Sequence, residues 1–262
     1  MQIEIPPTLL VSRSDGIARL RFNRPQQLNA IDVAMAEAFA AACRDIAADA
    51  SVRVVVLSGE GRGFGAGGDL AAFQTDPGAA ALAIIGPMHE GVKLLTALDA
   101  PVIASLHGVV AGGSMSLALA CDLAIAADDT TFNLAYVNVA ASCDLSGSYS
   151  LPRIVGLRNA MQIALLGETL GAEEALRLGL VNRVVPADQL AAETDRLAER
   201  LAHGPTRALG RMKKLMRASL DNPLAAQLDL EAEAFHASTQ TRDFGEALDA
   251  FFGKRTPRFE GR

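Results

Sequence analysis

Cysteine is scarce in this chain and is not arranged in pairs. The sequence has three cysteines, Cys43, Cys121 and Cys143, which are far apart and form no C-x-x-C motif. Disulfide frameworks and structural zinc sites need even-numbered or closely spaced sets of cysteines. We therefore expect no disulfide bonds, no bound metal, and a reduced, cytoplasmic setting.

Excess positive charge and long apolar runs are also missing. The net charge is −6 at pH 7, which argues against a surface for nucleic acid or for an anionic membrane. No run of about eighteen apolar residues occurs, so we expect no membrane span. Residues 1–10, MQIEIPPTLL, lack a basic segment followed by an apolar core, so we expect no signal peptide. A local basic pocket for phosphate groups remains compatible with this composition.

Apolar residues are plentiful and follow alternating strand and helix patterns. Half of the 262 residues are hydrophobic, enough for a sizeable core in one large domain or two small ones. Short apolar runs at residues 52–57, 101–106 and 123–126 predict buried strands. Helical patterns at 80–98 and after residue 113 lie between them. This alternation predicts an α/β layer fold.

The two ends of the chain have different patterns. Near the N-terminus, residues 9–12 and 17–22 flank the turn Ser14-Asp15-Gly16 and predict a β-hairpin. Asp32 then has the position of an N-cap for an alanine-rich helix. Beyond residue 151, strand character is confined to 180–185. Helical patterns occupy residues 190–202, 207–219, 224–237 and 241–251.

Two glycine-rich loops offer main-chain N–H groups to a ligand. Pro101 to Asp122, PVIASLHGVVAGGSMSLALACD, predicts a strand, a Gly-Gly turn and a helix. Val52 to Leu70, VRVVVLSGEGRGFGAGGDL, has a similar order. The first N–H groups of a helix lack partners and attract anions. Tight packing of a helix on a strand is the alternative for either loop alone. Two donors from two such loops, converging on one carbonyl oxygen, would form an oxyanion hole.

Five ordered motifs resemble the enoyl-CoA hydratase/isomerase family, also called the crotonase superfamily. The matching segments are Asn23-Arg24-Pro25 with Leu28-Asn29-Ala30, then Phe64 to Leu70, His107 to Asp122, Gly167 to Val185 and Phe252 to Gly261. The resemblance implies a crotonase-like spiral of ββα units over residues 1–195 and a C-terminal helical trimerisation region over 196–262. It also implies an acyl-CoA thioester substrate, no separate cofactor, and a homotrimer or dimer of trimers.

The resemblance also assigns roles to main-chain and side-chain groups. It gives the backbone N–H groups of Gly68 and Gly113 the role of oxyanion hole. The hydratases of the family place two glutamates across the double bond, and Ser116 and Tyr136 stand at those positions here. Neither side chain is a useful base near neutral pH, since a free tyrosine titrates near ~10. Simple hydration by a glutamate pair is therefore not expected.

Asp144 is the carboxylate that remains near these positions. Isomerases of the family and the 4-chlorobenzoyl-CoA dehalogenase have an aspartate at the corresponding place, and the segments around residues 148–156 also resemble that dehalogenase. Small and apolar neighbours would raise the pKa of Asp144 towards that of a usable base. The alternative is a loop aspartate that caps the helix beginning near Ser146.

His89 has two open interpretations. It stands where the dehalogenase has its water-activating histidine, and a histidine titrates near neutral pH. The alternative is a half-buried helix histidine with one hydrogen bond. Against a dehalogenase, Tyr136 replaces the tryptophan that holds its aspartate, and Gly68 replaces a bulky aromatic residue. Tyr136 is still able to hydrogen-bond to Asp144 or to substrate.

The resemblance suggests where coenzyme A would bind. Main chain near Leu28 and Ala66 would receive the adenine and pantetheine, and Arg24 and Lys214 are candidate phosphate partners. The alternative for both cations is a solvated surface charge. We expect Asp69 and Asp122 to cap helices or brace loops, and His107 to have a structural role at the end of its strand.

Three functions follow from these assignments. The favoured one is an acyl-CoA isomerase in which Asp144 moves a proton between the α and γ carbons of an enolate held by Gly68 and Gly113. The second is a hydrolytic aryl-CoA dehalogenase with Asp144 as nucleophile and His89 activating water. A family member that binds coenzyme A without catalysis is the third, and a hydratase is disfavoured by the missing glutamates.

Overall fold

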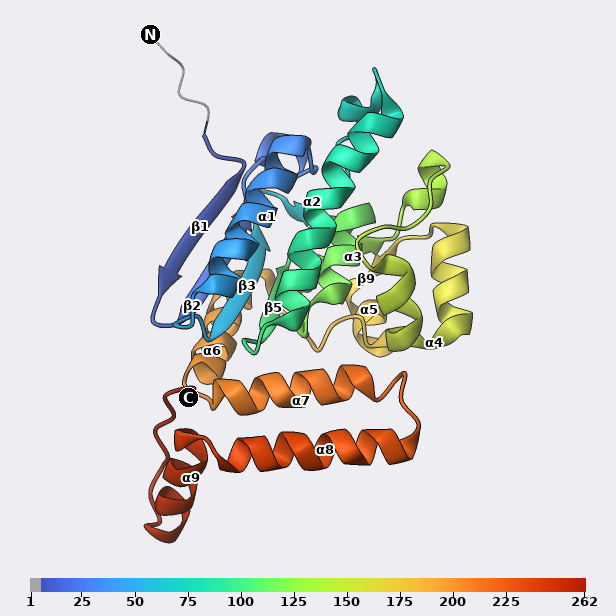
Figure 1. Cartoon of the computed structure of the whole chain (residues 1–262). Helices are drawn as coiled ribbons and strands as arrows, with labels where there is room; N and C mark the ends of the chain where they lie inside the picture. The colour runs from blue at the N-terminus through green and yellow to red at the C-terminus, as the bar shows by residue number, and fades with distance from the viewer. Residues whose placement is uncertain (1–5) are drawn as a thin grey trace.

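The computed structural model describes residues 6–262, so residues 1–5, on which part of the signal-peptide expectation rests, lie outside the described residues. Its larger sheet has the order β1-β2-β3-β5-β7-β10 (Figure 1). These strands are Leu9–Ser14, Ile17–Phe22, Val54–Gly59, Val102–Leu106, Leu123–Ala127 and Arg183–Val185. The β1–β2 pair is the predicted antiparallel hairpin, and the other pairs are parallel.

Buried strands explain the apolar runs of the sequence. Every side chain of β5 is buried, as are four of the five in β7, which is typical of parallel strands covered on both faces. Helices α1 (Val33–Ala48) and α2 (Pro77–Ala97) share the main core with one face. Helix α6 (Leu190–Ala202) packs Ala198 and Ala202 on the other. Asp32 caps α1 as predicted, since its Oδ1 accepts from the Met35 N–H at 2.8 Å.

A second, smaller sheet completes the repeating unit. Its order is β4-β6-β8-β9, with strands Gly63–Gly65, Val109–Ala111, Thr131–Asn133 and Leu170–Gly171. A strand of the large sheet, a strand of the small sheet and a helix follow one another three times along the chain. The helices that close these units are α2, α3 (Gly112–Ala120) and α4 (Gly147–Leu166). The predicted α/β fold built from ββα units is confirmed.

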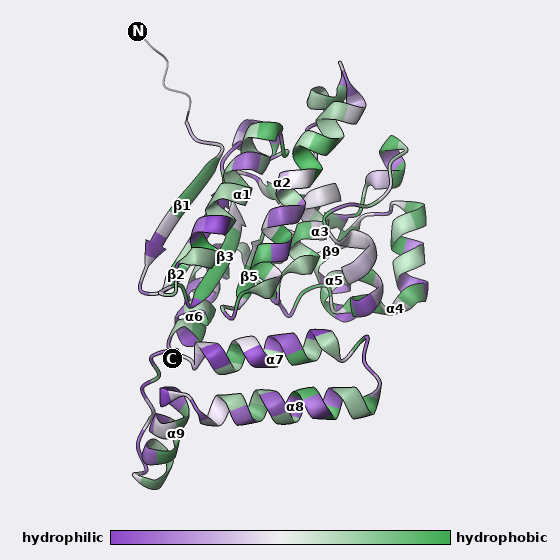
Figure 2. Ribbon diagram, in the orientation of Figure 1, coloured by the Kyte–Doolittle hydropathy of each residue, from purple (hydrophilic) through white to green (hydrophobic). Residues whose placement is uncertain are grey.

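The C-terminal helices extend from this core. Figure 1 shows α7 (Thr206–Ala218) along the edge of the core, α8 (Leu224–Thr239) beside it and α9 (Arg242–Phe252) at the end of the pair. Apolar and polar residues alternate along α7 and α8 (Figure 2). The resemblance placed the boundary between the spiral core and the C-terminal helical region at residues 195 and 196. Helix α6 spans this boundary, so the division into two regions stays a prediction. No helix within residues 6–262 has the length and apolar character needed to cross a membrane.

The remaining helical elements are short. They are α5 (Ala172–Leu178) and the 3₁₀ helices η1 (Pro25–Gln27), η2 (Leu70–Phe73), η3 (Tyr136–Val139) and η4 (Ala187–Gln189). Helix α4 is interrupted at Gly156, whose φ of 76° and ψ of 155° are not helical. The loop between η3 and α4 carries Asp144 to the N-terminus of α3, beside Gly113.

Candidate active site

The two glycine-rich loops pack backbone against backbone. A Cβ on Gly67 would lie 3.1 Å from both the carbonyl oxygen of Ala111 and the amide nitrogen of Gly113, and its φ is +93°. Only glycine takes that conformation readily. The Ser114 hydroxyl oxygen also accepts a hydrogen bond from the Gly67 N–H at 3.2 Å. These contacts fix the loop after β3 against the start of α3.

Gly68 and Gly113 present their N–H groups beside this contact. Neither N–H donates a hydrogen bond to another group of residues 6–262. Gly113 is the second residue of α3, where a helix provides no acceptor. The neighbours of Gly68 hold it in place, because Ile31 bonds to both Gly67 and Asp69. The two N–H groups predicted as oxyanion donors therefore lie on adjoining loops and are available to a ligand.

Asp144 lies against Gly113. A Cβ on Gly113 would be 3.5 Å from Asp144 Oδ1 and 3.7 Å from the Tyr136 hydroxyl oxygen. The Tyr136 hydroxyl donates to Asp144 Oδ1. The next two residues, Leu145 and Ser146, have left-handed φ values of 46° and 77°, a conformation that costs non-glycine residues energy. The loop therefore directs the carboxyl group of Asp144 towards the glycine loops.

The capping alternative for Asp144 is not supported by this geometry. Ser146, not Asp144, is the N-cap residue of α4, and no side chain caps that helix. Gly147 N–H bonds to the backbone carbonyl of Asp144 at 2.9 Å. The Asp144 side chain therefore has Tyr136, and no amide of α4, as its hydrogen-bond donor among the described residues.

Burial sets the ionisation of this pair. Loss of solvent raises the pKa of Asp144 above its usual range, while the Tyr136 hydrogen bond opposes that rise. Burial, followed by the charge of Asp144, raises the pKa of Tyr136 far above that of a free tyrosine. Tyr136 therefore stays protonated at neutral pH and serves as a donor. An ionised carboxylate with a raised pKa is suited to accept a proton.

His89 reaches the same loop from α2. Its Nε2 accepts a hydrogen bond from the Leu145 N–H at 3.1 Å. The proton of a neutral His89 is then on Nδ1, because Nε2 serves as the acceptor. His89 therefore anchors the residue that follows Asp144, and its Nε2 lone pair is already in use.

Comparison with known proteins agrees with this architecture. Residues 12–262 match the family model described as enoyl-CoA hydratase/isomerase. A relative from Rhodobacter capsulatus described as "Probable enoyl-CoA hydratase" is 38% identical, with 97% of this chain and 98% of that protein covered. The chain belongs to the enoyl-CoA hydratase/isomerase family.

Other members of the family differ in the reaction that their names give. The "1,2-epoxyphenylacetyl-CoA isomerase" of Escherichia coli is 36% identical, with 94% of this chain and 96% of that protein covered. A crystal structure of a "putative Enoyl-CoA hydratase/isomerase" from Mycobacterium abscessus has a TM-score of 0.93 at 34% identity and covers 97% of this chain and 100% of that one. The site residues, not the family, must therefore distinguish between reactions.

The candidate coenzyme A contacts fall into two groups. Leu28 and Ala66 are joined by a hydrogen bond from the Ala66 N–H to the Leu28 carbonyl at 2.9 Å, close to Gly67 and Gly68. Arg24 is also near, but its guanidinium pairs with Asp32 at 3.2 Å and with Asp69 at 2.9 Å. Arg24 therefore braces the loop that carries Gly68.

Lys214 lies apart from these groups. Its Nζ pairs with Asp99 Oδ1 at 2.7 Å, and both side chains are exposed. Asp99 precedes β5, whereas Gly113 follows it, so the pair lies at the other end of that strand. One copy of the chain therefore does not bring Lys214 to the glycine loops, and its role with phosphate stays a prediction.

Other predicted structural residues have clear partners. Asp69 caps η2 through the Ala71 N–H at 3.1 Å, and His107 Nε2 lies 2.9 Å from the Gly61 carbonyl oxygen. Asp122 accepts from the Val102 N–H at 2.9 Å. The sequence analysis did not single out Phe73, whose ring lies 3.6 Å from where a Cβ on Gly68 would be. Its position inside the short helix η2 gave no recognisable signal.

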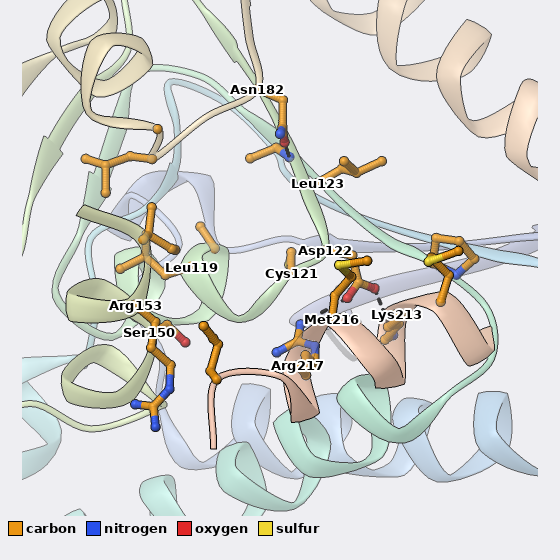
Figure 3. A pocket seen from close by; sticks show the side chains of 18 of the residues that line it. Leu119, Cys121, Asp122, Leu123, Ser150, Arg153, Asn182, Lys213, Met216 and Arg217 are labelled. Carbon is orange, nitrogen blue, oxygen red and sulfur yellow. Dashed lines mark hydrogen bonds and ion pairs between the residues drawn. The ribbon is translucent and has the colours of Figure 1, made fainter. Parts of the chain in front are cut away.

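A separate pocket of about 540 Å³ lies between α7 and the core (Figure 3). In it, Lys213 Nζ pairs with Asp122 Oδ2 at 2.8 Å and donates to the Leu95 carbonyl at 2.9 Å. Arg217 reaches Asp122 Oδ1 at 3.0 Å. Burial lowers the pKa of Lys213 despite the attraction of Asp122. Lys213 and Arg217 share the one carboxylate of Asp122, and these two ion pairs tie α7 to the core.

Proposed function

We propose that the protein is an acyl-CoA isomerase that converts a 3-enoyl thioester to the conjugated 2-enoyl isomer. The observation that carries the proposal is the Asp144 carboxyl group beside Gly113, with Tyr136 bonded to one of its oxygens. The thioester oxygen would accept from the N–H groups of Gly68 and Gly113. Such an oxyanion hole stabilises the negative charge that develops during reaction.

Asp144 supplies the proton transfers in this mechanism. Its Oδ2 takes a proton from the α carbon, and the electrons of that C–H bond form a dienolate whose charge rests on the thioester oxygen. The same carboxylic acid then returns the proton to the γ carbon, which places the double bond next to the thioester. The overall reaction leaves Asp144 ionised and needs no other reactant.

Hydration has weaker support in this site. The positions of the two glutamates are held by Ser116 and Tyr136, which bond to each other at 3.0 Å. Because the pKa of Tyr136 is raised by burial and by Asp144, it does not activate water at neutral pH. A single carboxylate suits a proton transfer between two carbons better than the addition of water.

A hydrolytic aryl-CoA dehalogenase is the second candidate, because His89 and Asp144 meet at one loop. Asp144 would attack the ring carbon and expel halide, and water activated by His89 would then hydrolyse the ester. Nε2 of His89 would have to release the Leu145 N–H to act as that base. The small Gly68 also leaves the ring without the aromatic partner expected there.

Assembly and substrate binding complete the proposal. Leu28 and Ala66 would border the coenzyme A, with an acyl chain entering between the glycine loops and Asp144. Apolar side chains on the outer helices, including Leu224, Leu228 and Phe235, are exposed in one copy. Their burial between copies would support a homotrimer or a dimer of trimers.

The test presents three substrates to the purified protein: a 3-enoyl-CoA, a 2-enoyl-CoA and 4-chlorobenzoyl-CoA. We expect conjugated thioester from the first, and a loss of roughly 10²- to 10⁴-fold in Asp144→Asn. Asp221→Asn is the matched control, because Asp221 is an exposed partner of Arg153. Faster hydration of the 2-enoyl-CoA, or chloride release from the aryl thioester, would contradict the isomerase assignment.

A further inference from the structure

Ser116 lies behind the proposed acid/base group. It is fully buried on α3, three residues after Gly113. Residues three apart share one face of a helix, so the helix that presents the Gly113 N–H also directs Ser116 towards the Asp144 loop. The Ser116 hydroxyl oxygen lies 3.0 Å from the Tyr136 hydroxyl oxygen.

The direction of this hydrogen bond follows from the partner of Tyr136. The phenol has one proton, which it donates to Asp144 Oδ1. Ser116 is therefore the donor to the phenol oxygen, and the order of donation is Ser116 to Tyr136 to Asp144. Hydrogen bonds in such a chain polarise and strengthen one another.

We propose that Ser116 is a positioning residue for Asp144. It holds the Tyr136 hydroxyl as a donor to Oδ1, which leaves Oδ2 of Asp144 free to exchange a proton with the acyl chain. Tyr136 is the side-chain donor to Asp144 among residues 6–262, and it donates to Oδ1 rather than Oδ2. This inference rests on the proposed acid/base role of Asp144 and extends it to two residues that stand at the glutamate positions of the hydratases.

Three titratable groups face Asp144. Tyr136 comes from η3, His89 comes from α2, and Cys143 precedes Asp144 in its own loop. The Tyr136 hydrogen bond favours the ionised carboxylate and so opposes the effect of burial. Removal of the Ser116 hydroxyl weakens that hydrogen bond, and the pKa of Asp144 then moves up.

The small number of aromatic residues that absorb in the near-UV makes Tyr136 usable as a spectroscopic reporter of Asp144 ionisation. The sequence has no tryptophan and two tyrosines, Tyr136 and Tyr149. Tyr149 is exposed and its ring faces the Arg153 guanidinium, so Tyr149→Phe leaves one tyrosine, in contact with Asp144. The near-UV spectrum of that tyrosine changes when its hydrogen-bond partner gains a proton. An acid titration without substrate then reports the ionisation of Asp144.

The comparison uses Ser116→Ala in the Tyr149→Phe background. We expect the midpoint of the acid transition to rise by roughly 0.3 to 1 pH unit, since one donor of a charged hydrogen-bond chain is lost. The transition should be absent in Asp144→Asn. Ser105→Ala is the matched control, because its buried hydroxyl lies 2.9 Å from the Thr194 hydroxyl in another part of the core, and it should leave the midpoint unchanged.

Kinetics separate positioning from simple packing. Ser116→Ala should lower kcat roughly 3- to 10-fold with little change in KM, as expected for one lost hydrogen bond. The same change should add nothing in a Tyr136→Phe background, because Ser116 acts through Tyr136. Tyr136→Phe alone, which keeps the ring, supplies a second variant if Ser116→Ala does not fold.

The outcomes distinguish this inference from the proposed function. A midpoint that moves no more than in Ser105→Ala, or a reporter without an Asp144-dependent transition, overturns the role of Ser116. The titration needs no substrate, so a shifted midpoint in a protein that does not convert 3-enoyl-CoA would keep the Ser116 inference and reject the isomerase assignment.

Discussion

In the proposed site, the loops around Gly68 and Gly113 would offer main-chain groups to the substrate, whereas the loop around Asp144 would offer side chains. Close backbone packing holds the first region, and Gly67 is at its tightest point. Hydrogen bonds from Tyr136 and to His89 hold the second. Side-chain substitutions leave the first region largely intact and change the second completely. The proposed oxyanion site is therefore compatible with the different reactions named for members of this family.

After Asp144→Asn, the largest effect is expected from Gly67→Ala, which alters the main-chain region. The new Cβ would lie 3.1 Å from backbone atoms of α3 at a φ of +93°. It must therefore move the loops apart, and loss of an oxyanion donor typically costs about 10²- to 10³-fold in rate. Steady-state kinetics with a 3-enoyl-CoA measure the effect.

Gly86→Ala is the glycine control for that variant. No heavy atom lies within 4 Å of a Cβ built on Gly86, which is inside α2. Alanine there should preserve the rate and stabilise the helix by about 0.5 to 1 kcal/mol. A wild-type rate in Gly67→Ala would show that the main-chain region tolerates displacement.

An intermediate effect is expected from Tyr136→Phe, in the side-chain region. Loss of its hydrogen bond removes stabilisation of the ionised Asp144, so the pKa of Asp144 rises further. The base form then appears only at higher pH, and the acid limb of kcat/KM should move to higher pH. At neutral pH the rate should fall roughly 10-fold, since a hydrogen bond to a charged group is lost.

Tyr149→Phe tests the specificity of that result. Tyr149 is exposed on α4 and faces Arg153 rather than Asp144. Its pH profile should match that of the unmodified protein. An acid limb that stays fixed in Tyr136→Phe would mean that Tyr136 does not control the ionisation of Asp144.

The smallest effect is expected from substitution of His89, for which we compare His89→Ala with His89→Asn. Alanine removes the acceptor of the Leu145 N–H, which should lower the free energy of unfolding by about 1 kcal/mol and kcat by a few-fold. Asparagine keeps a polar acceptor and should restore part of both losses. Complete loss of turnover in both variants would instead make His89 a catalytic base.

Strong local patterns predicted much of this fold. The hairpin of β1 and β2, the Asp32 cap and α6 were predicted from alternation, capping and helical spacing. The strands of the small sheet were not, because β4, β6 and β8 have three residues each, too few to show a period. They form where the loops after longer strands meet, which is a property of the whole fold.

In the candidate site, too, some features were predicted from the sequence and others depend on the folded structure. The two glycine-rich loops predicted a pair of main-chain donors, and the family resemblance assigned them to Gly68 and Gly113. The sequence also singled out Asp144 and Tyr136, but the order of donation from Ser116 depends on distances across three elements. For Arg24 the sequence suggested a phosphate partner, whereas in the structure its guanidinium pairs with Asp32 and Asp69. No sequence motif indicates that pairing.

The most direct test of Asp144 as the acid/base group follows deuterium from the α carbon of a 3-enoyl-CoA. A thioester that carries deuterium at C2 is converted in ordinary water in a single turnover, and the product is analysed for deuterium at C4. We predict transfer to C4 by the unmodified protein, and loss of both transfer and turnover in Asp144→Asn. A variant without the Asp144 carboxylate that still moves deuterium from C2 to C4 at the unmodified rate would contradict it.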